Sequence, residues 1–197
     1  MKPTAEQRQA LEPLMDAALR RTLDLFSRLS GEAWQTLSLS LEGLSGPLLG
    51  AAPGSQPLHV IQLSWPGGTG MLILNEPDGL TLSQAYLVKT IKTRVDWLDR
   101  RALPAAALAE IANIVVHAAP NVWADACGIG LLLSVPTLWR GSAQELEPQL
   151  RERLRQAGGF SLALTMELSC ERLPARCSVK VLMTDPFVEK LLTAHPV

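Results

Sequence analysis

The stretch that decides the fold lies near the C-terminus and reads Phe160-Ser-Leu-Ala-Leu-Thr-Met-Glu-Leu168, followed after a turn around Pro174 by Cys177-Ser-Val-Lys-Val-Leu-Met183. In both segments an apolar side chain recurs at every second position, which is typical of a strand with one face on a core. Because a short turn joins the two segments, they are predicted to form an antiparallel hairpin.

The same kind of pattern predicts further strands, namely Leu58–Trp65, Gly70–Leu74, Thr36–Glu42 and Gly128–Val135. The first two form a second hairpin across Pro66-Gly-Gly-Thr69, where glycine supplies the positive φ of a tight turn. In the Thr36–Glu42 strand, Leu37, Leu39 and Leu41 are expected on the buried face. Between Gly43 and Pro57, glycine, proline and serine interrupt any regular element, and the sequence predicts a mobile loop.

Helical spacing of apolar residues predicts helices over Ala5–Leu29, Leu87–Leu98, Ala105–Ala119, Gln144–Ala157 and from Asp185 onward. Pro13 predicts a kink or a late start of the first helix, and Pro120 is expected to end or bend the third. The segment Glu76–Gly79 is expected to form a turn. Strands in runs, with helices gathered between them, predict an α+β fold with a mostly antiparallel, mixed sheet of about six strands packed against long helices, in one domain over residues 1–197.

Composition excludes several classes of protein. The 197 residues include 18 basic and 19 acidic ones, so the chain lacks the basic surplus that nucleic-acid binding needs. No apolar run approaches the ~20 residues that span a bilayer, and residues 1–8 lack the features of a secretory signal. We therefore expect a cytoplasmic protein without membrane insertion. Its three cysteines, Cys127, Cys170 and Cys177, are expected to be reduced thiols, and their spacing predicts no metal site.

Charge is distributed unevenly along the chain. Residues 43–75 contain no Asp, Glu, Lys or Arg, and between Arg101 and Arg140 only Glu110 and Asp125 are charged. These tracts are expected to form sheet and buried helix. A carboxylate isolated in such a tract suggests a function.

Glu110 lies on the helix that follows Pro104, in the sequence Leu-Ala-Glu110-Ile-Ala-Asn113. Residues three apart project from the same side of a helix, so Glu110 and Asn113 are neighbours, with Ala106 and His117 on the same line. Apolar residues cover the opposite side and are expected to be buried: Leu108, Ile111, Ile114, Val115 and Ala118. Spacing alone is also compatible with an ordinary solvent-exposed stripe.

The segment Glu110-Ile-Ala-Asn113, followed by a charge-poor stretch that ends in Ser134-Val-Pro136, resembles the phosphatase motif of the CheC/CheX/FliY family of chemotaxis proteins. The first helix carries no second Glu-x-x-Asn, so the chain is most similar to CheX, which has one such site. The resemblance implies a CheC/CheX-like fold and a phosphatase that removes the phosphoryl group from the aspartate of a CheY-like receiver.

The resemblance also implies roles for individual residues. Asn113 would position the attacking water and Glu110 would engage the receiver's lysine, while His117 and Pro136 would contact the substrate protein. No cofactor of its own is implied, because the receiver brings Mg²⁺; a homodimer through a sheet edge and a CheD-like partner are further implications. The alternative is a catalytically silent module of the same fold that binds a receiver, a CheD-like protein or itself. Ala106 and His117 differ from the Asp or Ser and the Gly that the family has there.

Overall fold

The centre of the molecule is a six-stranded sheet in the order β1-β5-β6-β3-β2-β4. The computed structural model describes residues 4–44, 46–49, 56–90, 103–156 and 159–194. The strands are β1 (Gln35–Gly43), β2 (Leu58–Trp65), β3 (Gly68–Asn75), β4 (Thr137–Gly141), β5 (Phe160–Cys170) and β6 (Ala175–Thr184). Each of these strand pairs is antiparallel, so the α+β prediction is confirmed and the mixed character is not found among them.

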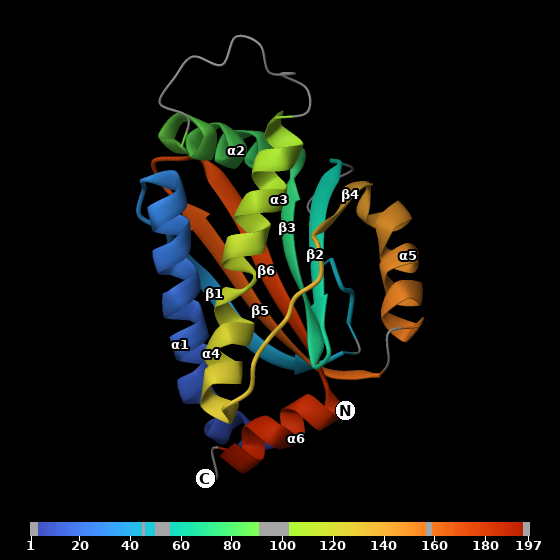
Figure 1. Cartoon of the computed structure of the whole chain (residues 1–197). Helices are drawn as coiled ribbons and strands as arrows, with labels where there is room; N and C mark the ends of the chain where they lie inside the picture. Colours follow the sequence, from blue (N-terminus) through green and yellow to red (C-terminus); the bar gives the residue numbers. More distant parts are fainter. Residues whose placement is uncertain (1–3, 45, 50–55, 91–102, 157–158, 195–197) are drawn as a thin grey trace.

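Helices cover both faces of this sheet and its two ends (Figure 1). They are α1 (Ala5–Ser30), α2 (Glu76–Thr90), α3 (Leu103–Val115), α4 (Ala118–Cys127), α5 (Ala143–Gln156) and α6 (Asp185–Ala194). α1, α3 and α4 lie on one face, α5 lies on the other, and α2 and α6 cross the two ends. The first helix begins at Ala5 and continues through Pro13, so the expected late start is wrong.

Alternating side chains of the strands build two cores on the two faces of the sheet. On the face covered by α1, α3 and α4, Leu164 of β5 and Val181 of β6 are paired in register and fully buried. On the other face, Val60 and Met71 pack with Leu150 of α5 in a second cluster. Because both faces are covered, β3 is buried from Gly68 to Leu74, and β2 and β6 are buried at most of their positions.

The β2–β3 hairpin is tighter than predicted. Only Pro66 and Gly67 separate the strands, because β3 begins at Gly68 rather than at Gly70. A Cβ atom at Gly68 would overlap the backbone oxygen of Leu182 on β6, so glycine is required here for the close approach of two strands.

Part of the loop predicted over residues 43–57 is fixed against α5. The Glu147 carboxylate accepts hydrogen bonds from the backbone N–H groups of Leu48 and Leu49 at 2.8 and 3.0 Å. Lys180 Nζ donates to the Leu48 oxygen at 2.7 Å, and burial lowers the pKa of this lysine.

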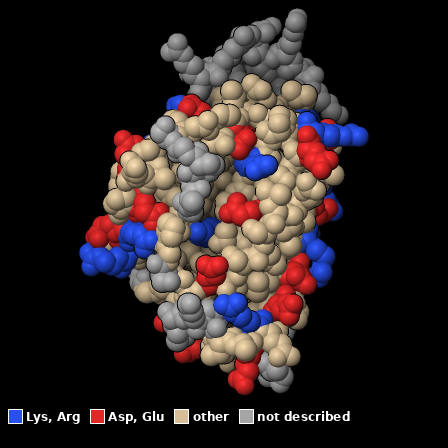
Figure 2. All heavy atoms as spheres, turned by 180° about the vertical axis from the view of Figure 1, so that it is seen from behind, with Lys and Arg blue, Asp and Glu red and all other residues tan. Residues whose placement is uncertain are grey.

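Figure 2 shows the molecule from this side, with acidic and basic residues interspersed rather than gathered into a patch of one sign.

Two further local predictions are corrected. The segment Glu76–Gly79 opens α2 instead of forming a turn, because the Asn75 side chain accepts a hydrogen bond from the Asp78 N–H at 2.8 Å and caps the helix. Leu37 is 52% exposed, because β1 shifts its register against β5 at this residue. Of the helix predicted around Leu87–Leu98, the part after Thr90 lies outside the described residues.

By length and composition alone, the stretch Pro104–Cys127 could cross a membrane. Half of its most apolar window is buried inside the protein, and the core helices of water-soluble proteins meet the same criterion. The stretch is moreover divided into α3 and α4.

Candidate functional site

The candidate site lies on the outer side of α3. The inner side of this helix packs on the sheet through side chains that are at most 4% exposed, namely Ala107, Leu108, Ile111, Ala112 and Val115. Ile114, predicted to be buried with them, is only half-buried. Packing along the whole inner side fixes the rotation of the helix and therefore the direction in which its outer side points.

The outer side of α3 carries the polar residues that the sequence spacing predicts on one side of this helix. Ala106 and Glu110 are exposed, and Asn113 and His117 are half-buried. The Glu110 and Asn113 side chains lie one helical turn apart and form no hydrogen bond or ion pair with the residues that the structure describes. A carboxylate and a carboxamide are thus presented together on a rigid element, where a partner molecule can reach them.

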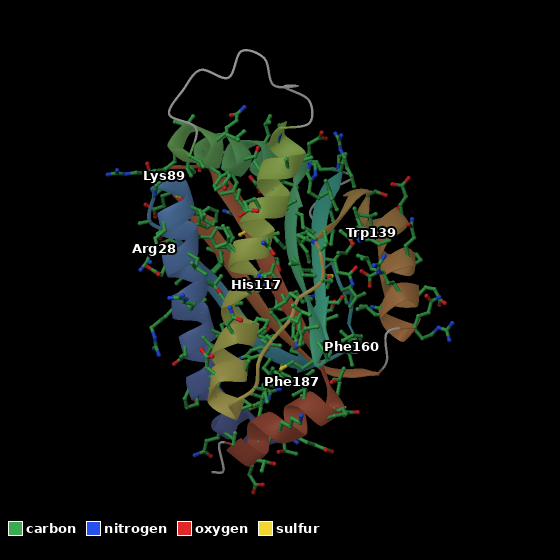
Figure 3. All side chains as sticks on the ribbon, viewed as in Figure 1. Arg28, Lys89, His117, Trp139, Phe160 and Phe187 are labelled. Atoms are coloured by element: carbon green, nitrogen blue, oxygen red, sulfur yellow. The ribbon has the colours of Figure 1, made fainter. Side chains whose placement is uncertain are left out.

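His117 lies at the break between α3 and α4 (Figure 3). Its ring nitrogen Nδ1 is hydrogen-bonded to the backbone oxygen of Asn113, so the imidazole covers the C-terminal end of α3 beside the candidate site. The sequence predicted one helix as far as Ala119. Instead α3 ends at Val115, and Pro120 lies in the first turn of α4. Backbone N–H groups in a first turn have no partner within the helix, so a proline, which has no N–H, is tolerated there. Pro120 therefore opens a second helix rather than ending the first.

The segment that follows α4 differs from its prediction. Residues 128–136 have no regular secondary structure, and the strand expected over Gly128–Val135 begins instead at Thr137 as β4. The segment leaves α4 at Gly128, which has a left-handed φ of 63°, and it is hydrogen-bonded to β2 at Ser134. There, the Ser134 N–H donates to the Ser64 oxygen at 2.8 Å, and the Ser64 N–H donates to the Ser134 hydroxyl at 3.0 Å.

Pro136 is half-buried at the end of this segment, immediately before β4. Because β4 contacts α3, the chain brings Pro136 back towards the helix that carries Glu110 and Asn113. Of the four predicted site residues, Glu110 and Asn113 lie on α3, His117 lies at its junction with α4, and Pro136 precedes β4, which contacts α3. In Figure 1 the segment runs upward alongside α4 to β4.

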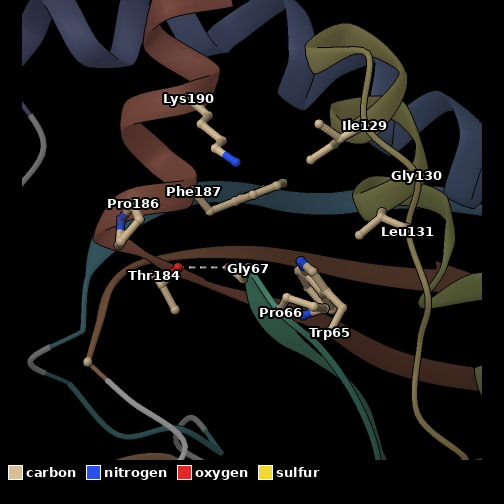
Figure 4. Close-up of a pocket in the computed structure, with 11 residues that line it drawn as sticks. Trp65, Pro66, Gly67, Ile129, Gly130, Leu131, Thr184, Pro186, Phe187 and Lys190 are labelled. Atoms are coloured by element: carbon tan, nitrogen blue, oxygen red, sulfur yellow. Dashed lines mark hydrogen bonds between the residues drawn. The ribbon is translucent and has the colours of Figure 1, made fainter.

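A separate cavity of about 360 Å³ lies between the β2–β3 turn, α6 and the start of the same segment (Figure 4). Trp65, Phe187 and Leu131 are among its apolar lining residues, and Lys190 is the charged residue of its lining. The Thr184 hydroxyl already donates a hydrogen bond within the protein, to the Gly67 oxygen at 3.2 Å. No residue of α3 lines the cavity, and its lining combines no nucleophile with a base.

Within the described ranges, no three His, Cys, Asp or Glu side chains are arranged to hold a metal ion. The three cysteines are free thiols, and burial raises the pKa of Cys127 and of Cys177. A raised pKa keeps these thiols protonated at neutral pH, which does not suit a nucleophile. The chemistry that this face can perform is therefore that of Glu110, Asn113 and the adjacent imidazole.

The sequence does not predict the exposure of two apolar residues on the segment between α4 and β4. Leu132 and Val135 are each 84% exposed. Their segment was expected to be a paired strand, in which such side chains would be covered. The sequence does contain a signal against a strand here. Gly128 and Gly130 lie at the start of the segment and Pro136 lies at its end, and glycine and proline interrupt strands.

Comparison with known proteins identifies the fold. The sequence matches no protein-family model and no curated protein. FliY from Thermotoga maritima superposes with a TM-score of 0.68 at 14% identity, over 99% of this chain and 98% of that chain. The FliM middle domain from H. pylori gives a TM-score of 0.61 at 16% identity, over 97% and 99%. CheX in a complex with CheY, BeF3 and Mg²⁺ from Borrelia burgdorferi gives 0.53 at 15% identity, over 89% and 97%.

This chain has the CheC/CheX/FliY/FliM-middle-domain fold. The fold implied by the resemblance at Glu110 and Asn113 is thus confirmed. The match to FliY has a higher TM-score than the match to CheX, so the fold itself does not distinguish the CheX type from its relatives. Solved structures with this fold include FliM in complexes with SpeE and with FliG, both from H. pylori, and CheX in a complex with CheY.

Proposed function

We propose that this protein accelerates hydrolysis of the phosphoaspartate of a CheY-like receiver, with Asn113 and Glu110 as its catalytic pair. The observation that carries the proposal is the presentation of these two side chains, one turn apart, on the outer side of a helix whose inner side is buried. Such a helix can insert both groups into a partner's site as a preformed unit. The proposed active unit is the whole chain, 1–197, acting in the cytoplasm.

Hydrolysis of an acyl phosphate needs little covalent assistance, because catalysis of phosphoryl transfer consists mainly of positioning and charge stabilisation. The Asn113 carboxamide can accept a hydrogen bond from the attacking water and donate one to a phosphoryl oxygen. This is the task that a glutamine performs in small GTPases. Asn113 would therefore hold the water in line with the phosphorus.

Glu110 would engage the lysine of the receiver's active site. Its carboxylate is exposed one turn from Asn113, so it can reach a cation on the partner while Asn113 reaches the phosphoryl group. An ion pair of this kind fixes orientation more than it adds affinity. His117 and Pro136 flank the pair and would contact the receiver.

The charge of this surface supports a protein substrate rather than a small phosphate ester. Residues 103–139 contain Glu110 and Asp125 but no Lys or Arg, so this part of the chain has no cation to neutralise a phosphate. A receiver provides Mg²⁺ and lysine with its own phosphoaspartate, and no cofactor of this chain would be required. The CheX structure from Borrelia burgdorferi, solved with CheY, BeF3 and Mg²⁺, shows that one protein of this fold binds a receiver.

A second candidate is a module of the same fold without catalytic activity, which binds a receiver, a CheD-like protein or a second copy of itself. Two observations favour it. FliM middle domains match the chain as well as CheX does, and the motif's first polar position is occupied by Ala106, which contributes no hydrogen-bonding group. Under this alternative, a complex forms but the lifetime of the phosphorylated receiver does not change.

The decisive assay follows the decay of a phosphorylated CheY-like receiver with and without this protein. The phosphatase predicts faster decay, and loss of the acceleration in Asn113→Ala and Glu110→Ala. Matched controls are Asn121→Ala on α4 and Glu189→Ala on α6, which remove an exposed carboxamide and an exposed carboxylate elsewhere. Acetyl phosphate without a receiver should not be hydrolysed faster. Unchanged decay at saturating protein would exclude the phosphatase.

A further inference from the structure

The cavity between the β2–β3 turn, the start of α6 and the segment after α4 takes no part in the proposed function, because no residue of α3 lines it (Figure 4). Its lining comes from three parts of the chain that are far apart in the sequence, so the fold itself assembles it. The volume of about 360 Å³ lies at the small end of the ~300–1,000 Å³ typical of ligand pockets. The cavity therefore has the size of a site for a small molecule.

The wall of this cavity is mainly apolar, and part of it is aromatic. Trp65 and Phe187 meet edge to face, with ring centroids 6.4 Å apart, and both belong to the main core. Ile129, Leu131 and Pro186 are further apolar lining residues. Because aromatic side chains interact well with the edges and faces of other rings, this wall favours a ligand with a flat, apolar body.

One cation faces the cavity. Lys190 of α6 points its ammonium group towards it (Figure 4), and no Asp or Glu belongs to the lining. Lys190 forms no ion pair with the residues that the structure describes. The adjacent Glu189 lines a neighbouring hollow over α4 and α6, which Lys190 also borders, but it does not line the cavity. The charge at the cavity is thus complementary to an anion.

The wall also contains a hydrogen-bond donor without an acceptor. The indole N–H of Trp65 is buried and has no partner among the described residues, whereas the Thr184 hydroxyl donates to the Gly67 oxygen. A buried donor without a partner costs free energy, which an acceptor on a ligand would recover. Because neighbouring atoms cover the indole nitrogen, a ligand oxygen would reach it with a change of side-chain rotamer, and such changes are common on binding.

We propose that this cavity binds a small aromatic monocarboxylate, with its apolar body against Trp65 and Phe187 and its carboxylate on Lys190. A single lysine balances one negative charge, so a monoanion fits better than a doubly charged phosphate ester. The lining pairs no nucleophile with a base, so the cavity is a binding site rather than a second active site. This inference does not rest on the proposed function.

The test uses cinnamate and its neutral amide, cinnamamide, which share one aromatic body and differ in charge. By isothermal titration calorimetry, the wild-type protein should bind one cinnamate per chain with a Kd below about 1 mM, and cinnamamide about tenfold more weakly. Lys190→Gln should weaken cinnamate binding by about tenfold and leave cinnamamide binding unchanged. Arg21→Gln, which removes an exposed cation on α1, is the control and should change neither affinity.

Leu131→Trp tests where the probe binds, because the larger side chain should fill the cavity and abolish binding of both compounds. Lys190 is exposed, so Lys190→Gln should fold and decides the question even if Leu131→Trp does not fold. No cinnamate binding by the wild-type protein, equal affinities for the acid and the amide, or cinnamate binding unaffected by Lys190→Gln would overturn the proposal. So would cinnamate binding retained by a folded Leu131→Trp, because the probe would then occupy another site.

Discussion

At the scale of single residues, the outer side of α3 combines a carboxylate, a carboxamide and an imidazole on an otherwise apolar helix. The spacing of Glu110 and Asn113 predicts that they share one side, and the structure places them so. What spacing could not predict is the position of His117, because its hydrogen bond to the Asn113 oxygen depends on the break after Val115. The roles of these residues remain predictions.

His117 is expected to position the receiver rather than to take part in the chemistry. We predict that His117→Ala loses about 1 kcal/mol of stability, because the hydrogen bond to Asn113 is lost. KM for the phosphorylated receiver should rise a few-fold while kcat stays close to the wild-type value. Urea denaturation and steady-state kinetics measure these quantities. A fall of kcat as large as that of Asn113→Ala would make the imidazole part of the catalytic machinery.

His59 on β2 should make stability depend on pH. Burial, followed by the positive charge of Arg140, lowers the pKa of His59 below its ordinary value of 6.5. Well above pH 6.5 the imidazole is neutral in both the folded and the unfolded chain, so His59 costs no stability there. As pH falls below this value, the unfolded chain takes up a proton that the folded chain resists, so stability is lost.

We therefore expect the melting temperature of the wild-type protein to fall between about pH 7.5 and about pH 5.5 more steeply than that of His59→Gln. The variant lacks the titrating ring, whereas every other ionisable group is retained. Parallel melting profiles of the two proteins over this range would show that His59 does not contribute to the pH dependence.

At the scale of elements, the junction between α3 and α4 depends on a glycine in the sheet. Gly70 of β3 lies directly under Val116, and an added Cβ atom would overlap the Val116 side chain. Gly70→Ala should therefore destabilise the protein by about 1–3 kcal/mol, the usual cost of overpacking a core. Gly130→Ala is the control, because a Cβ there meets open space. Equal urea midpoints for the two variants would contradict this account of the junction.

The boundaries of helices and strands were predictable where a local residue pattern determines them. They were not predictable where a contact between residues far apart in the sequence determines them. The alternation in Phe160–Leu168 and the Asp185-Pro186 start of α6 gave the right elements. The strand expected over Gly128–Val135 was wrong, because an apolar run becomes a strand only where a neighbouring strand edge is available, and β4 takes that edge from Thr137 onward. Glu76–Gly79 became helix because Asn75 caps it.

At the scale of the whole molecule, the α+β class followed from the order of strands and helices, but the strand order did not. β1 pairs with β5, more than a hundred residues later, and β3 pairs with β6, so the sheet is assembled from contacts that no local pattern encodes. The charge-free tract of residues 43–75 contains the adjacent strands β2 and β3. The second charge-poor tract forms α3, α4 and the segment beside them, so it marks the surface on which Glu110 is exposed.

The central claim is that Asn113 and Glu110 act as a phosphatase site, and one measurement tests it most directly. The decay of a phosphorylated CheY-like receiver is followed with wild-type protein, Asn113→Ala and Asn121→Ala at equal concentrations. We predict accelerated decay with the wild-type protein and with Asn121→Ala, and decay at the receiver's own rate with a folded Asn113→Ala. Equal acceleration by Asn113→Ala and the wild-type protein would contradict the claim.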